Sequence, residues 1–149
     1  MLSIHSDEHF MMEALKQAEM GYEYGEVPVG AVVVCNNKII ARAHNQTEQL
    51  NDVTAHAEML ALTAAFNYIG AKYLPDCRLF VTLEPCLMCA GALFWSQIGG
   101  LVYGASDPKR GFSLVKEKSV LHPSTEVMHG IMSVECKLII DRFFDRIRN

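Results

Sequence analysis

The sequence predicts an α/β fold, with a mixed β-sheet that carries helices on both faces. Short β-rich segments alternate with longer segments whose apolar residues recur at helical spacing. The expected order of elements is α-ββ-α-β-α-β-(β)-α, which suggests a mixed sheet. The 149 residues contain no repeat and no linker, so we expect a single domain over residues 1–149.

The first helix is predicted to begin after Ser6, whose hydroxyl can cap it. Asp7 and Glu8 follow in the first turn, where the helix dipole favours negative charge. Apolar residues then recur at helical spacing, and either of two glycines can end the helix: Phe10, Met11, Ala14, Leu15 and Ala18, then Gly21 or Gly25.

A hairpin is expected next, because two β-rich runs, 29–35 and 38–43, flank Asn36-Asn37 and asparagine tolerates the positive φ of a tight turn. Thr54 is expected to cap a second helix over 55–68, before Gly70. The later elements are predicted in this order: a strand over 78–83, a helix from 86 to about 97, a strand over 101–104, a turn-rich stretch over 106–123, a strand over 126–129 and a helix from 133 to about 148.

Composition narrows the possible classes of function. Half of the residues are hydrophobic, but no apolar run approaches the ~20 residues that span a bilayer. The opening MLSIHSDEHF lacks the pattern of a signal peptide, so we expect a cytoplasmic protein without a membrane partner. Five cysteines are an odd number for a reducing compartment, which argues against a disulfide framework and leaves room for a metal site.

The net charge of −4 argues against a broad surface that coats nucleic acid. Positive residues nevertheless gather in two places. Each group is either part of a local basic groove or an ordinary solvated face: Lys109, Arg110, Lys116 and Lys118, and then Arg142, Arg146 and Arg148.

Two short segments, each at a predicted helix start, carry candidate metal ligands. Cys86 and Cys89 are three residues apart and share a helix face, so both can reach one ion. The helix N-terminus favours their thiolate forms. With His56 they make a Cys₂His set, which suits zinc and leaves the fourth tetrahedral position open for water.

Glu58 is the candidate proton carrier. It lies two residues from His56, and such positions do not share a helix face, so Glu58 is poorly placed to bind the same ion. It can still reach a zinc-bound water, whose pKa zinc lowers to about 7. A closed structural site is the alternative. However, Cys35, Cys77 and Cys136 form no second Cys-x-x-Cys pair and are expected to be small buried residues.

His-x-Glu followed by Pro-Cys-x-x-Cys is the known signature of zinc nucleobase deaminases. The chain resembles the TadA family of tRNA-specific adenosine deaminases within the cytidine-deaminase-like superfamily. The resemblance covers nearly the whole chain, and these stretches carry it: EVPVGAV at 26–32, TAHAE at 54–58, VTLEPCLMCAGA at 81–92, YGASDPK at 103–109 and Phe143-Phe144.

The resemblance implies a three-layer α/β/α fold with a mixed five-stranded sheet and one zinc ion per subunit. It also implies a homodimer that converts adenosine to inosine at the wobble position of a tRNA anticodon loop, with no role for DNA. Zinc-bound hydroxide would attack C6 of the flipped base while Glu58 shuttles protons. Further residues match family positions that contact the substrate: Asn45, Ala57, Val27, Pro28, Asp107, Lys109 and Phe144.

Several of these residues have simpler explanations. Asn45 and Asp107 are also common turn formers. Phe144 either stacks on a base or packs its helix, and at most one of Phe143 and Phe144 is expected to face the core. The apolar run 92–95 is either a dimer surface or core. The stretch 111–122 departs from the family pattern, so the sequence leaves open which RNA is read.

Three functions therefore compete. The first is the tRNA deaminase, and the second is an enzyme acting on free guanine, cytosine or cytidine with the same zinc core. The third is a module with a structural zinc, or an inactive subunit of an editing complex, which would have no use for the acid beside the metal. The motifs favour the first.

Overall fold

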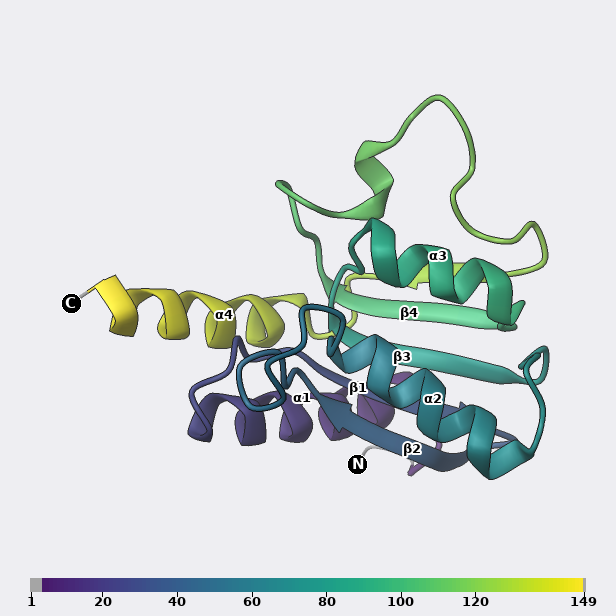
Figure 1. Ribbon diagram of the computed structural model, residues 1–149, viewed down its shortest axis with the longest axis horizontal. Coiled ribbons are helices and arrows are strands. Elements are labelled where there is room, and N and C mark those ends of the chain that lie inside the picture. The colour runs from purple at the N-terminus through teal and green to yellow at the C-terminus, as the bar shows by residue number, and fades with distance from the viewer. Residues whose placement is uncertain (1–3, 149) are drawn as a thin grey trace.

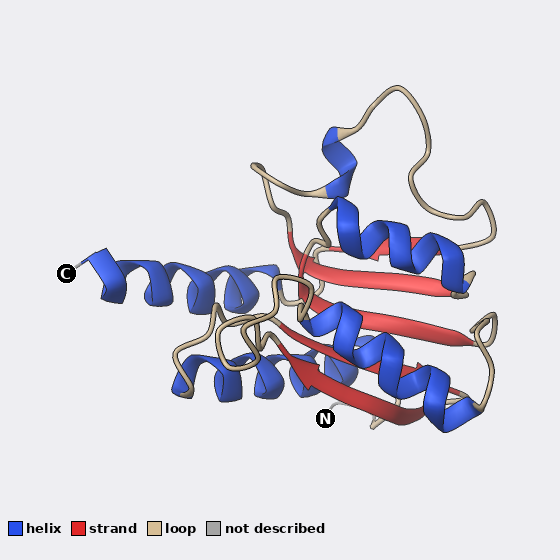
Figure 2. Ribbon diagram, viewed as in Figure 1, coloured by secondary structure: helices blue, strands red, loops and turns tan. Residues whose placement is uncertain are grey.

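The computed structural model describes residues 4–148, which form a five-stranded mixed sheet between two layers of helices (Figure 1). The α/β fold class predicted from the sequence is confirmed (Figure 2). No helix within the described range is both long and apolar enough to cross a bilayer. The elements are α1 (Asp7–Glu23), β1 (Gly30–Cys35), β2 (Lys38–His44), α2 (Ala57–Ile69), β3 (Cys77–Leu83), α3 (Leu87–Ser96), β4 (Gly100–Ala105), a 3₁₀ turn (Phe112–Leu114), β5 (Glu126–His129) and α4 (Ser133–Arg148).

The strand order is β2-β1-β3-β4-β5. Strand β1 is antiparallel to both of its neighbours, whereas β3, β4 and β5 run parallel. Parallel pairing brings Leu83, at the end of β3, opposite Ala105, at the end of β4. The connections that leave these two strands therefore start side by side at one edge of the sheet, where ligands bind in folds of this kind.

Alternating side chains of the strands form two cores. Ala31 and Val33 pack under α2 and α3, whereas Val32 and Val34 face α1 and α4. The same period of two continues in β3, where Phe80 joins the second core between its neighbours in the first. Such burial on both faces explains why the central strands read as continuous apolar runs.

The predicted hairpin is present. Asn36 and Asn37 have φ values of 52° and 61°, as expected for a tight turn that suits twisted strands. Ser6 also caps α1 as predicted, because its side chain accepts a hydrogen bond from the backbone N–H of His9 at 3.1 Å.

The predicted start of the second helix is wrong. Thr54 does not cap it, because the Asp52 carboxylate accepts hydrogen bonds from both the backbone N–H and the hydroxyl of Thr54 and holds it in a turn. The helix begins at Ala57, with His56 as the N-cap residue. The third helix starts one residue later than predicted, at Leu87, with Cys86 as its N-cap.

Helix α1 approaches β1 very closely at Gly30. A Cβ atom at this position would overlap the backbone of Ala14 and Ala18. The other end of α1 contacts α4, where Tyr22 packs against Phe143 and two guanidinium groups lie over its ring, those of Arg142 and Arg146. The position of α4, which extends beyond the sheet in Figure 1, therefore depends on that of α1.

Candidate metal centre and active site

Three potential metal ligands converge at the edge of the sheet. Nδ1 of His56 lies 3.7 Å from Sγ of Cys86 and 3.5 Å from Sγ of Cys89. A tetrahedral zinc ion bound by one nitrogen and two sulfurs holds such atoms about 3.5 Å apart. Within residues 4–148, only these three side chains form a group of ligand atoms within 4.8 Å of one another. The set therefore fits zinc and leaves one tetrahedral position without a protein ligand.

The secondary structure positions these side chains. His56 and Cys86 are the N-cap residues of α2 and α3, and neither side chain forms a capping hydrogen bond. Both are thus free to face the space between the two helix starts. Cys89 is three positions into α3 and completely buried, so it points to the same space. Two positive helix ends meet here and favour anionic ligands.

The two thiols differ in their ionisation. Hydrogen bonds from the Cys89 thiol and from the His56 imidazole lower the pKa of Cys86 to about 3. The pKa of Cys89 is raised, first by its hydrogen bond to Cys86 and then by burial. The Cys86 thiol therefore ionises readily, and its negative charge disfavours ionisation of Cys89. Two sulfurs that are placed to share one cation behave in this way.

Glu58 lies beside this group. Its side chain is only 4% exposed, and its carboxyl group is within hydrogen-bonding reach of the Cys89 thiol. Burial, opposed by weaker interactions that include the nearby His56, raises the pKa of Glu58 to about 7. A carboxyl group that both holds and releases a proton near neutral pH suits acid–base catalysis.

The remaining cysteines lie outside this group. Cys77 and Cys136 are buried in the two cores, and Cys35 is half-buried in β1 opposite Cys77. All five cysteines are free thiols.

Asn45 follows β2 and is almost fully buried. Its side-chain amide donates a hydrogen bond to the carbonyl of Val27, and its carbonyl accepts one from the backbone N–H of Thr47. Asn45 thus links the loop that contains Val27 and Pro28 to the turn after β2. These bonds form a turn, so its contact with substrate stays a prediction, as does that of the buried Ala57 backbone.

Asp107 also forms a turn, because its carboxylate accepts hydrogen bonds from the backbone N–H groups of Lys109 and Arg110. The side chains of Lys109 and Arg110 are exposed. Phe143 is buried and Phe144 half-buried, so one of the pair faces the core, as expected.

Two buried carboxylates that bind backbone amides of loops were not singled out from the sequence. Glu26 and Glu84 are each almost completely buried, and each accepts hydrogen bonds from two backbone N–H groups of a neighbouring loop. Their position in the sequence could have indicated burial, because each is an acidic residue within an apolar stretch that contains a proline. Glu26 opens EVPVGAV, and Glu84 lies in VTLEP.

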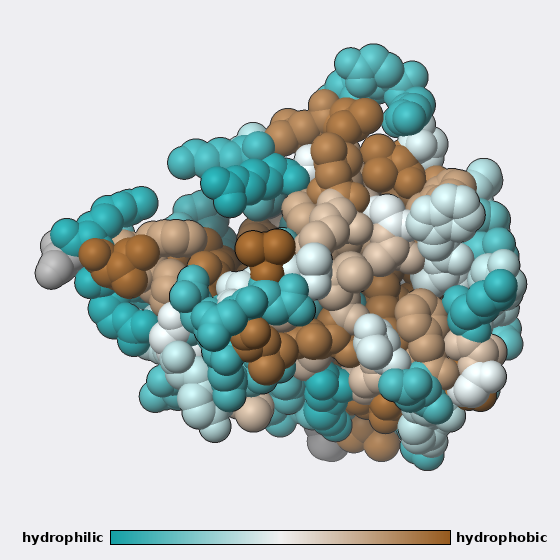
Figure 3. Space-filling model, viewed as in Figure 1, coloured by the Kyte–Doolittle hydropathy of each residue, from teal (hydrophilic) through white to brown (hydrophobic). Residues whose placement is uncertain are grey.

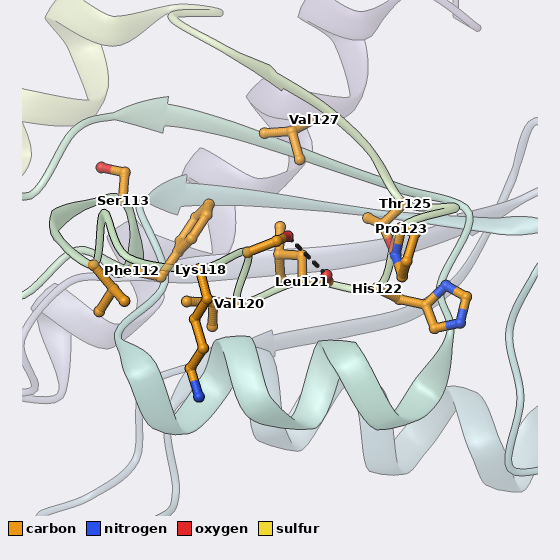
Figure 4. Close-up of a pocket in the computed structure, with 11 residues that line it drawn as sticks. Phe112, Ser113, Lys118, Val120, Leu121, His122, Pro123, Thr125 and Val127 are labelled. Atoms are coloured by element: carbon orange, nitrogen blue, oxygen red, sulfur yellow. Dashed lines mark hydrogen bonds between the residues drawn. The ribbon is translucent and has the colours of Figure 1, made fainter.

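A cavity of about 270 Å³ lies beneath the connection between β4 and β5. Figure 4 shows Phe112, Leu121 and Val127 around it, together with the hydrogen bond from the Ser119 hydroxyl to the carbonyl of Leu121. None of the three metal-ligand candidates lines it. The cavity is therefore separate from the metal group.

Known proteins share this arrangement. Residues 4–105 match the family described as the cytidine and deoxycytidylate deaminase zinc-binding region. The tRNA-specific adenosine deaminase of Bacillus subtilis (strain 168) is 45% identical, with 95% of this chain and 91% of the relative covered. The enzyme of that name from Aquifex aeolicus (strain VF5) is 41% identical, with 95% and 96% covered.

Solved structures agree. One from a study of A-to-I editing by tRNA:A34 deaminases matches with a TM-score of 0.83 and 42% identity, covering 88% of this chain and 98% of that one. A guanine deaminase from Nitrosomonas europaea matches with a TM-score of 0.79, covering 93% and 84%, but its 22% identity shows the shared fold alone. The chain belongs to the tRNA-specific adenosine deaminase family of the cytidine-deaminase-like superfamily, and it is a deaminase.

Proposed function

We propose that this enzyme hydrolyses adenosine to inosine at the wobble position of a tRNA anticodon, releasing ammonia. The observation that carries the proposal is the meeting of His56, Cys86 and Cys89 at two helix starts, with the buried Glu58 beside them. The substrate is inferred from the relatives, which are named for tRNA and adenosine.

The residues of this chain have distinct parts in that reaction. His56 and the two cysteines would hold one zinc ion, which supplies a Lewis acid that activates water as the nucleophile. Glu58 would accept a proton from the attacking water and deliver it to N1 of the adenine ring. It would then take the second proton of the water from the new hydroxyl group at C6 and pass it to the departing amino group, so that one water is consumed and one ammonia leaves.

The substrate has to expose its base. An anticodon loop presents unpaired bases that can be flipped into a pocket, unlike the stacked bases of a duplex. Asn45, Val27, Pro28 and the backbone of Ala57 are proposed to hold the flipped nucleoside. Lys109, Asp107 and Phe144 are proposed to contact its neighbours.

Charge supports an RNA substrate despite the net charge of −4. The connection from β4 to β5 carries four exposed cations that form no ion pair with any residue from 4 to 148: Lys109, Arg110, Lys116 and Lys118. Unpaired cations are available to replace the counterions of phosphates.

A homodimer is part of the proposal. Apolar residues gather over α3 and the base of the long β4–β5 connection (Figure 3). Three large side chains of α3 are exposed there, Leu87, Met88 and Trp95, the last at 75%. A surface of this kind marks an interaction site. Sedimentation should show a dimer that Trp95→Asp weakens and that Met20→Asp does not, because Met20 is exposed on α1, which covers the other face of the sheet.

The test of function is direct. Purified enzyme is incubated with a short anticodon stem-loop that carries adenosine at the wobble position, and the RNA is digested and analysed for inosine. Inosine at that position alone supports the proposal. Turnover of free guanine, cytosine or cytidine, with the stem-loop unchanged, would replace it with a free-base enzyme.

A further inference from the structure

Glu84 is a buried carboxylate that holds a loop. It is 3% exposed, and within residues 4–148 it pairs with no cation. One carboxylate oxygen accepts a hydrogen bond from the backbone N–H of Asp107 at 3.1 Å, and the other accepts one from that of Ser113 at 2.9 Å. Burying a charge is unfavourable unless strong donors compensate it, so these two amides are tied closely to the carboxylate.

Gly111 packs directly against the Glu84 carboxyl group. A Cβ atom at this position would overlap the Glu84 carboxyl group. The backbone φ of Gly111 is −64°, which any residue adopts, so the need for glycine here comes from space alone. The next residue, Phe112, donates its backbone N–H to the carbonyl of Pro85 at 2.9 Å. The loop 107–113 is thus closed around the segment that leads into Cys86.

Glu26 holds a second loop in the same way. It is 0% exposed, and its two oxygens accept hydrogen bonds from the backbone N–H groups of Glu48 at 3.0 Å and Gln49 at 2.7 Å. The loop it holds is also tied to the approach to His56, because Gln46 donates its backbone N–H to the carbonyl of Ala55. Each carboxylate therefore fixes one loop next to one metal-ligating segment.

These two loops carry the candidate substrate contacts. The loop held by Glu84 contains Asp107 and Lys109, and the loop held by Glu26 follows Asn45. We infer that Glu26 and Glu84 are positioning residues that fix the two loops proposed to contact the RNA, without touching the substrate themselves. The inference rests on the proposed function for the identity of the substrate, and on hydrogen bonds within this chain for the positioning.

Comparison with Glu13 supports a role for Glu26 and Glu84 that differs from general stabilisation of the fold. Glu13 is also buried, but its oxygens bind the cations Lys16 and Arg42, on the face of the sheet that α1 covers. Its partners join α1 to β2, whereas the partners of Glu26 and Glu84 are backbone amides of loops at the site. Glu13→Gln is therefore a matched control for the loss of a buried carboxylate.

Three variants test the inference. Glu84→Gln and Glu26→Gln keep the size of the side chain, but the new amide nitrogen cannot accept a hydrogen bond, so one loop amide loses its acceptor. Gly111→Ala displaces the same loop as Glu84→Gln and leaves the carboxylate in place. Zinc content and thermal unfolding are measured first, to confirm that each variant is folded and metal-loaded.

The expected result is a higher KM with a nearly unchanged kcat. KM for the anticodon stem-loop should rise about tenfold in each variant, as for the loss of one hydrogen bond to a charged group. The value of kcat should stay within about twofold, because the metal ligands and Glu58 are untouched. Hydrogen exchange at the amides of Asp107 and Ser113 should accelerate in Glu84→Gln and not in Glu13→Gln.

The outcomes separate this inference from the proposed function. Wild-type enzyme that leaves the stem-loop unchanged refutes the function, and amide exchange alone then decides whether the carboxylates position the loops. Unchanged exchange at Asp107 and Ser113 in Glu84→Gln overturns the inference. So does active wild-type enzyme whose variants keep the wild-type KM, or lose kcat alone.

Discussion

Sγ of Cys89 lies 3.5 Å from Nδ1 of His56, although 33 positions separate the two residues in the chain. The contact exists because α2 and α3 begin at the same edge of the sheet and each presents a side chain at its N-terminus. Neither helix alone supplies enough ligands to hold a metal tightly. The site is therefore a product of the fold, and its properties are open to measurement at each ligand.

Removal of one ligand should release the metal. Cys89→Ala leaves two ligands, so zinc measured by inductively coupled plasma mass spectrometry should fall from about one ion per chain to near zero. Cys136→Ala is the control, because Cys136 is equally buried but belongs to α4 and packs in the other core. Full zinc content in Cys89→Ala would mean that Cys89 is not a ligand.

Glu58→Gln should separate metal binding from turnover. The amide has the same shape but cannot accept a proton, so kcat should fall about 100- to 10,000-fold, the usual contribution of a general acid–base group. Zinc content should not change, because Glu58 is outside the ligand set. Retained activity would remove Glu58 from the mechanism, and lost zinc would make it a ligand.

Binding of RNA should depend steeply on salt. With the Glu58→Gln protein, the logarithm of the association constant for the stem-loop should fall linearly with that of the salt concentration, by about 0.7 per phosphate contacted. Replacing both Lys116 and Lys118 with alanine should make the slope shallower by about 1.4, if each lysine contacts one phosphate.

Lys72→Ala is the control for this experiment, because Lys72 is exposed between α2 and β3, at the opposite edge of the sheet from the metal group. Affinity that does not respond to salt would argue for a neutral free base as the ligand.

The ion pairs of Glu13 should stabilise the fold above acidic pH. Hydrogen bonds, first from Lys16 and then from Arg42, lower the pKa of Glu13. The unfolded chain therefore binds a proton more readily than the folded one, and the stabilisation is lost as pH falls through the folded pKa. Both cations are substantially exposed, so the contribution is modest.

Glu13→Gln should lower the free energy of unfolding by about 1 kcal/mol at pH 7, measured by urea titration. At about pH 3 the difference in stability should be smaller than at pH 7, because the stabilisation from a carboxyl group with a lowered pKa is progressively lost as the pH falls. A difference that stays constant between the two pH values would show that charge is not its cause.

Local patterns predicted most of the fold. The strand Glu126–His129 and the helix Ser133–Arg148 lie where residue periodicity placed them, and the Asn36-Asn37 turn follows from backbone preferences. These features are encoded by neighbouring residues. The start of α2 was predicted wrongly because two capping residues compete, and the Asp52 carboxylate engages Thr54 before the helix begins.

The site was only partly predictable. The spacing of Cys86 and Cys89 and their pairing with His56 were readable from short motifs. The roles of Glu26 and Glu84 were not, because their partners are backbone amides more than twenty positions away, and backbone amides have no sequence signature. The 3₁₀ turn Phe112–Leu114 was missed for a related reason, since Phe112 is anchored to the distant Pro85.

The close approach at Gly30 has a consequence for anyone who redesigns this enzyme. Because α1 touches the backbone of β1 there, any side chain at position 30 would push the helix outward. Tyr22 would move with it and would carry away the ring on which Arg142 and Arg146 rest. The absence of a side chain at Gly30 therefore fixes the position of α1, and through Tyr22 that of α4. Attempts to change the substrate through the C-terminal helix should leave Gly30 intact.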